Sequence, residues 1–422
     1  MSEGADPHVV VVGGGVIGVS CAYFLARRGA RVTLLERSEI GSGASFGNAG
    51  CIAPGHGPLN KPGRVKQALT SVLSETSPLY VAPRWDPELL RWLRVFSRFC
   101  TAAHQERSLR ALAPLSRETI GLYRELVRGE AIDCSYRPEG YYEVFLTERA
   151  LAGATREAGL IRQHGFGADA LSGGAMRERE PALKERIVGG VFLRDGASID
   201  PHRFVTGLAE RAGRYGAAVR TGVTVSAVTT RGREVTGVET AAGETLPADV
   251  VVLATGAYSI ELARRLGCRY PLQAAKGYHR DRRVRVGETP PLRVTCMLGE
   301  RSVFCTPMND SVRFAGTLEF SGVNHVMRRS RLEQLTRSAQ QYLTGLGEAR
   351  AQSEWCGLRP CIADGLPVVG PVPGYRGAYV ATGHAMLGLT LGPVTGKLVS
   401  EYVLDGAPSL DVGAFRLDRF GP

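Results

Sequence analysis

The sequence of 422 residues has few of the features that fix a protein's class at first sight. Its nine cysteines, an odd number, include no Cys-x-x-Cys pair and no Cys/His array with zinc-ligand spacing. We therefore expect no metal site, and reduced thiols in a cytosolic protein. Low-complexity tracts, fixed-period repeats and heptad runs are absent as well, and the apolar (44%) and charged (22%) fractions are those of an ordinary globular protein.

Signals for secretion or membrane insertion are also scarce. The segment Met1–His8 is polar and acidic, so no secretory signal is expected. The uncharged run Val9–Ala26 is long enough to span a bilayer, but its cluster Gly13-Gly14-Gly15 favours a turn over a lipid-facing helix. The net charge of +11 favours an anionic partner such as an acidic substrate, a bilayer surface or nucleic acid. Because no nucleic-acid-binding motif accompanies the charge, we predict no nucleic-acid partner.

A nucleotide-binding pattern is present near the start. The run Val9–Val12 is typical of a parallel strand buried on both faces, and a G-x-G-x-x-G segment follows it directly. In that segment Gly13 allows a tight turn, Gly15 lets the backbone approach a pyrophosphate, and Gly18 allows close packing of helix on strand. Glu36 lies 23 positions after Gly13, near the spacing at which a carboxylate binds ribose hydroxyls. The pattern predicts dinucleotide binding at a helix N-terminus.

A second glycine-rich segment, Gly41–Gly50, bears on which dinucleotide is bound. It reads Gly-Ser-Gly-Ala-Ser-Phe-Gly-Asn-Ala-Gly and resembles the G-x-G-A-S-x-x-N-A-G segment of the D-amino-acid oxidase superfamily. Its small residues leave backbone N–H groups free to face phosphate, and the Ser45 hydroxyl adds a donor. The resemblance implies FAD, with this segment around the pyrophosphate and under the flavin ring. No second G-x-G-x-x-G fingerprint is present, which argues against a nicotinamide-dependent dehydrogenase.

The most specific resemblance lies near the C-terminus. The segment Trp355–Pro360 reads Trp-Cys-Gly-Leu-Arg-Pro, and Asp364–Gly370 and Ala381–Pro393 follow it. Together they resemble the blocks W-x-G-L-R-P, D-G-x-P-x-x-G and T-G-H-x-x-x-G-x-T of D-amino acid dehydrogenases, glycine oxidases and sarcosine oxidases. With the N-terminal motifs, the resemblance extends over almost the whole chain.

This resemblance implies three residues at the substrate. The arginine of G-L-R-P pairs with the substrate carboxylate in such relatives, which assigns that role to Arg359; the alternative is a salt bridge between domains. A planar guanidinium can hold a carboxylate through two hydrogen bonds and stays charged. Tyr278, in a Lys-Gly-Tyr element, is expected to contact the carboxylate or line the pocket, with an ordinary strand tyrosine as the alternative. His384 is expected to adjust the flavin or lie beside the substrate, with a structural hydrogen bond as the alternative.

The last motif also predicts a helix next to the flavin. We expect a loop over Gly383–Thr390 and a helix over Pro393–Leu404. The resemblance implies that the N-terminus of this helix points at the flavin, where it would stabilise the reduced, anionic form. The element Thr255-Gly256 resembles part of another cofactor-side motif, A-T-G-A. The predicted cofactor-binding residues are Gly13, Gly15, Val16, Ile17, Gly18, Glu36, Arg37, Ala44, Ser45, Asn48, Gly50, Cys51, Val223, Thr255, Gly256, Gly383, Leu387, Gly388, Leu389 and Thr390.

These positions imply an α/β chain, α+β overall, with two domains. A Rossmann-like FAD-binding domain is expected to be assembled from the separate segments 1–57, 198–268 and 352–422. A substrate-binding domain with a mixed or antiparallel sheet is expected from 58–197 and 269–351, with the sheet forming a roof over the flavin.

The implied activity is oxidative deamination of D-amino acids, including D-proline or D-hydroxyproline. A hydride passes from the α-carbon to FAD N5, the imino acid yields a 2-oxo acid, and electrons go on to a quinone or another electron-transfer acceptor. Two alternatives stay open: an oxidase of glycine, sarcosine or other N-substituted amino acids, and the FAD subunit of a hetero-oligomeric proline or hydroxyproline dehydrogenase. Homo- and hetero-oligomers are therefore both candidates.

A basic segment raises the question of membrane contact. Trp85–His104 is expected to form a helix with Leu89, Trp92, Phe96 and Phe99 on one side and Arg91, Arg94 and Arg98 on another. The simpler interpretation is a surface helix whose apolar face joins the core, and the alternative is contact with an anionic membrane. We expect a cytoplasmic protein that is either free or peripheral on the inner face of the cell membrane.

Overall fold

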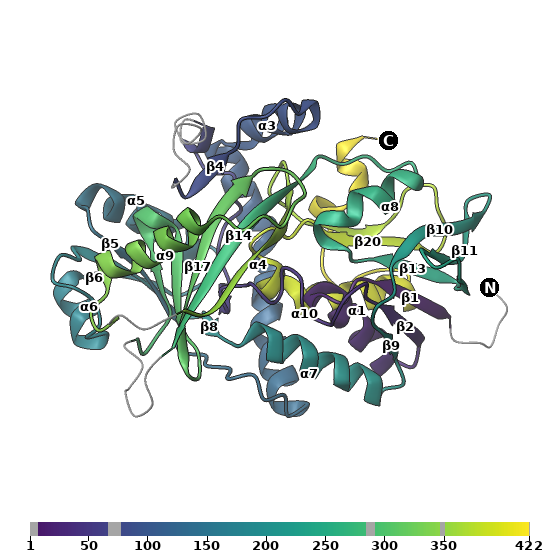
Figure 1. Ribbon diagram of the computed structural model, residues 1–422, viewed down its shortest axis with the longest axis horizontal. Coiled ribbons are helices and arrows are strands. Elements are labelled where there is room, and N and C mark those ends of the chain that lie inside the picture. Colours follow the sequence, from purple (N-terminus) through teal and green to yellow (C-terminus); the bar gives the residue numbers. More distant parts are fainter. Residues whose placement is uncertain (1–6, 66–76, 284–291, 347–350, 422) are drawn as a thin grey trace.

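The computed structural model describes residues 7–65, 77–283, 292–346 and 351–421. Two sheet-based halves lie side by side along the longest axis of the molecule (Figure 1). One half contains a six-stranded, mostly parallel sheet, and the other contains a nine-stranded mixed sheet. The predicted α/β class is confirmed.

The six-stranded sheet is built around the valine run. Its strand order is β19-β20-β13-β1-β2-β9, with β19 alone antiparallel to its neighbour. Val9 and Val11 pack into one hydrophobic layer, and Val10 and Val12 pack into the opposite one. This burial on both faces is what an interior parallel strand requires. The strands are β1 (His8–Val12), β2 (Arg31–Leu35), β9 (Ala218–Arg220), β13 (Val250–Leu253), β19 (Val368–Pro371) and β20 (Ala378–Thr382).

Helices cover one face of this sheet and a small antiparallel sheet covers the other. Helix α1 (Val16–Arg27) lies so close to α10 (Gly388–Leu404) that a Cβ at Gly396 would come within 2.5 Å of the Ser20 backbone. The uncharged run Val9–Ala26 therefore forms a strand, a turn and a helix. Among the described residues, no helix has the length and apolar character to cross a membrane. The opposite face carries β10 (Val225–Arg231), β11 (Glu234–Thr240), β12 (Thr245–Pro247) and α8 (Ser259–Arg265).

Helix α10 begins five residues earlier than the sequence predicts, because a tyrosine replaces a missing backbone donor. Pro393 has no N–H to bond to the carbonyl of Leu389 one turn before it. Tyr123, on α4 (Ala102–Arg124), donates its hydroxyl to that carbonyl at 2.5 Å. The helix can therefore run through the proline and start at Gly388 instead.

The larger sheet has the order β18-β14-β17-β16-β15-β5-β7-β6, with β4 paired to β17. The predicted boundary at residue 352 would assign β14 and β18 to different domains. In the structure, however, these two strands pair along most of their length. The division into two domains stays a proposal. The strands are β4 (Leu79–Val81), β5 (Tyr141–Phe145), β6 (Ala168–Ser172), β7 (Gly189–Leu193), β14 (Leu272–Arg283), β15 (Cys296–Leu298), β16 (Val303–Pro307), β17 (Ser311–Phe320) and β18 (Ala351–Ile362).

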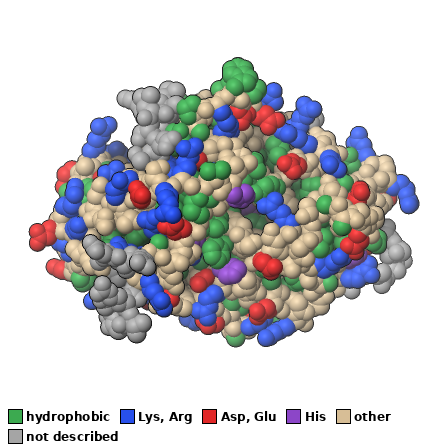
Figure 2. Space-filling model, viewed as in Figure 1, with side chains coloured by type: hydrophobic (Ala, Val, Ile, Leu, Met, Phe, Trp, Pro, Cys, Tyr) green, Lys and Arg blue, Asp and Glu red, His purple; other side chains and the backbone are tan. Residues whose placement is uncertain are grey.

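The helix predicted over Trp85–His104 is shorter in the structure: α3 covers Pro87–Phe99, and His104 already belongs to α4. The apolar face of α3 joins the core. Trp92 is buried and donates its indole N–H to the carbonyl of Cys361 at 3.0 Å. On the face seen in Figure 2, Lys and Arg side chains are spread over both halves and interspersed with Asp and Glu. The remaining longer helices are α5 (Glu148–Gln163), α6 (Gly173–Arg179), α7 (Pro201–Arg214) and α9 (Arg329–Tyr342), and β3 (Cys51–Ile52) pairs with β8 (Ala197–Ser198).

Candidate cofactor and substrate site

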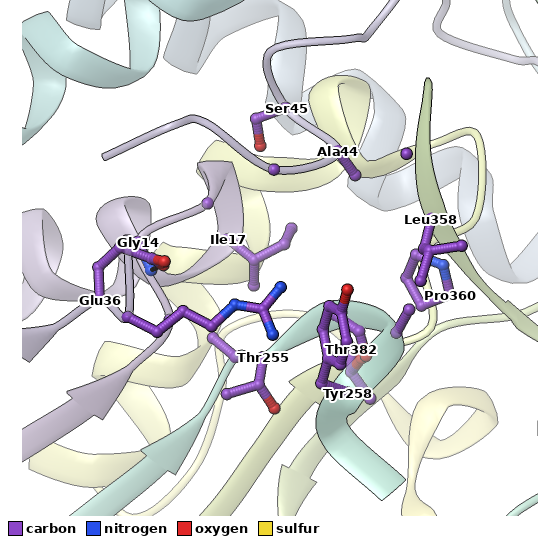
Figure 3. Close-up of a pocket in the computed structure, with 18 of the residues that line it drawn as sticks. Gly14, Ile17, Glu36, Ala44, Ser45, Thr255, Tyr258, Leu358, Pro360 and Thr382 are labelled. Carbon is purple, nitrogen blue, oxygen red and sulfur yellow. Dashed lines mark hydrogen bonds between the residues drawn. The ribbon is translucent and has the colours of Figure 1, made fainter. Parts of the chain in front are cut away.

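A pocket of about 660 Å³ opens at the carboxyl ends of β1, β2, β13 and β20. This is the edge at which parallel α/β sheets bind ligands. In Figure 3, Gly14 and Glu36 lie at one end, Leu358 and Pro360 of β18 at the other, and Tyr258 between them. Both halves of the molecule therefore contribute to the lining.

Two glycines of the turn after β1 lie against neighbouring backbone, and a third lies next to open space. Gly13 has φ +111°, and a Cβ there would lie 2.5 Å from the carbonyl oxygen of Ala254. A Cβ at Gly18 would overlap the carbonyl oxygen of Gly13. Gly15 differs, because its Cβ would meet only the Ser45 hydroxyl oxygen, at 3.4 Å. Gly13 and Gly18 thus bring α1 onto the sheet, whereas Gly15 leaves room at the pocket.

Glu36 is held at the end of β2 by two backbone amides. Its carboxylate accepts hydrogen bonds from Gly14 N at 2.6 Å and Ser38 N at 2.9 Å. Each carboxylate oxygen keeps a further lone pair, which is available to a ribose hydroxyl. Beside it, the Arg37 guanidinium lies 3.8 Å from the centroid of the Tyr258 ring, a cation–π contact in the pocket wall.

The loop after β2 is tied to the first turn of α1. Val16 N donates to the Ser45 hydroxyl oxygen at 2.9 Å, so Ser45 satisfies one of the unpaired amides of the helix start. The hydroxyl hydrogen of Ser45 is left to donate into the pocket. Asn48 accepts from Gly50 N at 2.9 Å and closes the end of the loop.

These residues fit the two phosphates of FAD. A Cβ at Gly43 or Gly256, both in the lining, would meet no atom within 4 Å, so their backbones face open space. The first-turn amides of α1 and its positive dipole end also face this space. A pocket of this volume is within the range usual for cofactor sites.

Arg359 lies at the far end of the pocket without an acidic partner. Its Nη1 donates to the carbonyl of Thr317 at 2.8 Å, and the guanidinium covers Gly277, where a Cβ would overlap it. Burial lowers the pKa of Arg359, but an arginine stays charged at any working pH. No carboxylate of the described residues forms an ion pair with it, so the predicted alternative of a salt bridge between domains is not seen. The remaining N–H groups can receive an anion.

A strained residue positions the Arg359 guanidinium. Thr317 has φ +62°, which is rare for a β-branched residue, and it lies where the β14–β17 pairing shifts register. The bulge turns the Thr317 carbonyl towards Arg359. Strain of this kind is concentrated at functional sites, where the surrounding structure maintains it.

His384 lines the same end of the pocket and is neutral. Burial lowers its pKa to about 3. Its Nε2 lies 2.9 Å from the hydroxyl oxygen of Thr395, whereas its buried Nδ1 has no partner among the described residues. The side chain therefore makes a structural hydrogen bond and keeps one ring nitrogen for a ligand.

The structure brings most of the predicted cofactor residues to the pocket. Several others instead support it: the Thr390 hydroxyl accepts from Ala53 N at 3.0 Å, and Cys51 is buried in β3. The predicted residues in the lining are Gly13, Gly15, Val16, Ile17, Glu36, Arg37, Ala44, Ser45, Asn48, Val223, Thr255, Gly256, Gly388 and Leu389, with Arg359 and His384. Those outside it are Gly18, Gly50, Cys51, Gly383, Leu387 and Thr390.

Tyr278 is placed differently from the prediction. It is fully buried, outside the lining, and donates its hydroxyl to Glu319 at 2.7 Å. Its neighbour Gly277 lies under Arg359, so Tyr278 projects from the opposite face of β14. This placement argues against a contact between Tyr278 and a substrate carboxylate.

Two residues that were not predicted as site residues shape the pocket in different ways. Trp355 lines it and packs on Gly47, where a Cβ would overlap its indole ring. Arg313 lies outside the lining, donates to the carbonyls of Phe46 and Asn48 and forms a paired ion bridge with Asp281, so it fastens the loop to the large sheet. Trp355 belongs to the W-x-G-L-R-P motif and is predictable from it, whereas Arg313 carries no such signal.

Among the described residues, no cluster of three or more His, Cys, Asp or Glu side chains could hold a metal ion.

Known proteins resemble the chain over nearly its whole length. A family model described as FAD dependent oxidoreductase matches residues 8–402. A D-amino acid dehydrogenase of Methylobacterium nodulans is 34% identical over 408 residues, 96% of each chain. Another, of Methylobacterium radiotolerans, is 33% identical over 420 residues, 98% of this chain and 99% of the relative.

Solved structures share the fold. Glycine oxidase from Bacillus cereus ATCC 14579 aligns with a TM-score of 0.74 and 23% identity, over 96% of this chain and 99% of that chain. L-proline dehydrogenase from P. horikoshii aligns with a TM-score of 0.74 and 19% identity, over 98% of each. The prediction of an enzyme with FAD as cofactor is confirmed, and the chain belongs to the FAD dependent oxidoreductase family.

Proposed function

We propose that this enzyme oxidises D-amino acids and that Arg359 binds their α-carboxylate. The observation that carries the proposal is the unpaired guanidinium at the far end of the pocket, held by Thr317 over Gly277. A planar fork with open N–H groups suits a carboxylate better than a single point charge would. The curated relatives named D-amino acid dehydrogenase support the choice of substrate class.

The residues around Arg359 would orient the substrate and do little proton chemistry. Neutral His384 adds no second positive charge to compete for the carboxylate, and its Nδ1 can hydrogen-bond a ligand. The N-terminus of α10, with Gly388 and Leu389 in the lining, directs a positive dipole end at the pocket. When bound, FAD would supply the oxidising chemistry by accepting hydride from the α-carbon at N5. Positioning of the substrate is then the main task of the protein.

The substrates we propose are neutral D-amino acids, including D-proline or D-hydroxyproline, with electrons passing on to a quinone or another electron-transfer acceptor. The test is anaerobic bleaching of the enzyme-bound flavin with a panel of D-, L- and N-methyl amino acids. Bleaching by D-forms and not by their L-forms supports the proposal. Bleaching by glycine or sarcosine alone contradicts it, and an FAD-loaded chain that no amino acid bleaches indicates a missing partner subunit.

Contact of α3 with an anionic membrane is a second, separate proposal. Arg91, Arg94 and Arg98 are exposed, and Trp85, just before the helix, is 86% exposed. Anionic liposomes should retain the protein at low salt, and reversal of the three arginine charges should release it. Retention that survives the charge reversal would contradict the proposal.

A further inference from the structure

Behind the large sheet lies a buried polar cluster that contains the Lys-Gly-Tyr element. The side chains of Lys276 and Glu319 are 1% and 0% exposed, and their charged atoms are 3.3 Å apart. Tyr278 donates to the other carboxylate oxygen of Glu319 at 2.7 Å. Arg328 and Arg331 approach the same carboxylate at 3.3 Å and 3.8 Å.

The shortest hydrogen bonds of Lys276 go to a loop and not to Glu319. Its Nζ donates to the side-chain oxygen of Asn324 at 2.6 Å and to the carbonyl of Val326 at 2.9 Å. A buried ammonium is costly unless it is fully hydrogen-bonded, so these contacts account for a lysine inside the sheet. Lys276 therefore ties the loop between β17 and α9 to the large sheet.

This loop, which we call the strap (Gly322–Met327), reaches across to the other half of the molecule. Nε2 of His325 lies 2.8 Å from the hydroxyl oxygen of Tyr258, and Cys356 Sγ donates to the His325 carbonyl at 3.4 Å. His325, Tyr258 and Cys356 all line the pocket. The outer surface of the strap is apolar, with Val323 and Val326 61% and 66% exposed.

Tyr258 is itself fixed at the cofactor end. It ends the 3-10 turn η2 (Gly256–Tyr258) after β13, and its ring is stacked by Arg37, the neighbour of Glu36. In Figure 3 the Tyr258 ring lies between Glu36 and the β18 residues, along the length of the pocket. The bond between His325 and Tyr258 therefore joins the strap to the cofactor half of the molecule at the pocket that fits FAD.

We propose that the strap is a latch that retains FAD, and that Lys276 is a positioning residue which holds His325 where it can bond to Tyr258. FAD must enter and leave past this bond, so breaking it should speed release of the cofactor. The inference rests on FAD binding and not on the identity of the amino acid, so it can fail while the proposed substrate class stands.

The test measures the rate at which FAD leaves the holoenzyme after dilution, followed by flavin fluorescence. His325→Ala and Tyr258→Phe should each speed release about fivefold, the effect of one hydrogen bond, and the double variant should be no faster than either single variant. Val323→Ala, on the exposed side of the strap, is the matched control and should release FAD at the wild-type rate. Multiplying effects in the double variant, or a wild-type rate in His325→Ala, would overturn the latch.

The positioning role needs its own comparison, since loss of a buried lysine can also weaken the fold. Asn324→Ala removes the shortest contact of Lys276 while leaving the lysine paired with Glu319, and it should speed FAD release without lowering the melting temperature of the apoprotein. Lys276→Met should release FAD at least as fast, and adding His325→Ala to it should change nothing further. If Asn324→Ala releases FAD at the wild-type rate, Lys276 does not position the strap.

Discussion

The two ends of the pocket differ in how their residues reach it. The cofactor end takes its turn, acidic residue and loop mainly from residues 13–48, a single stretch of chain. The substrate end combines Arg359, Thr317 and Gly277 from three neighbouring strands that are distant in sequence. The cofactor end therefore depends on local backbone geometry, and the substrate end depends on strand pairing and register.

The largest effect should come from breaking the local geometry at the cofactor end. In Gly18→Ala, the new Cβ would overlap the carbonyl oxygen of Gly13, which is rigid backbone. We expect loss of FAD binding together with a large drop in melting temperature. Gly213→Ala, on the exposed side of α7 with no atom within 4 Å of the new Cβ, is the control and should be neutral or stabilising by up to about 1 kcal/mol. Normal FAD content in Gly18→Ala would refute the packing role.

Breaking the substrate end should leave the cofactor end intact. In Arg359→Leu, the carboxylate loses its partner, and the KM for amino acids should rise about a hundredfold to a thousandfold, with FAD still bound. Arg359→Lys keeps the positive charge but loses the planar two-pronged guanidinium. Its KM should therefore lie between those of the wild type and Arg359→Leu. Steady-state kinetics and flavin content measure the two ends separately. Unchanged kinetics in Arg359→Leu would remove the proposed carboxylate site.

A smaller effect is expected at the start of α10, which lines the pocket through Gly388 and Leu389. Tyr123→Phe leaves the Leu389 carbonyl, one turn before Pro393, without a donor in a buried position. The free energy of unfolding should fall by about 1–3 kcal/mol in urea titrations. Tyr136, whose ring stacks on Tyr123 and whose hydroxyl bonds to no described residue, provides the control Tyr136→Phe. Equal losses in both variants would show that the hydroxyl bond to α10 is unimportant.

The smallest effect concerns the large sheet alone and depends on pH. Burial raises the pKa of Glu143 on β5 from 4.5 to about 7, although Lys61 opposes the shift. The folded state therefore disfavours the carboxylate, and stability falls as pH rises from about 4.5 to 7. Glu143→Gln should raise the melting temperature relative to wild type more at pH 8 than at pH 5.

Glu157 supplies a control of opposite sign. Burial raises its pKa, but Lys61, 2.5 Å away, outweighs this and holds the pKa below its ordinary value. The stability that this pair provides is present at neutral pH and is lost as pH falls, so Glu157→Gln should be destabilising at pH 8 and less so in acid. If the change in melting temperature of both variants were the same at every pH, the pKa directions given for Glu143 and Glu157 would both be wrong.

Much of the cofactor end could be predicted from the sequence, because the spacing of the glycines follows directly from the backbone geometry of the turn. Gly13 and Gly18 have the tight contacts expected of them, and Glu36 ends its strand within reach of the turn. Arg359 was found through its motif. The positions of the other substrate-half residues depend on features that no short pattern encodes. The bulge at Thr317 and the strand pairing decide that Gly277, and not Tyr278, faces Arg359.

At α10 and at His325, the structure also departs from what the sequence pattern indicates, because both depend on contacts between distant segments. The start of α10 depends on Tyr123, more than 250 residues before it in the chain, so a local helix pattern could only place it at Pro393. His325 reaches the pocket because Lys276 holds its loop from beneath, and the segment itself has no motif. Short sequence patterns encode local geometry and do not encode such contacts between distant segments.

The order of the six-stranded sheet has a consequence for synthesis of the chain. The valine strand β1 pairs with β2 at once, but its other neighbour, β13, begins only at Val250, and β20 follows at Ala378. During translation an apolar strand edge therefore waits for most of the protein to be made, a state prone to aggregation. The lining of the pocket that fits FAD is complete only once residues 381–389 have been made. We therefore expect supply of the cofactor and rescue by chaperones to affect the yield of active enzyme.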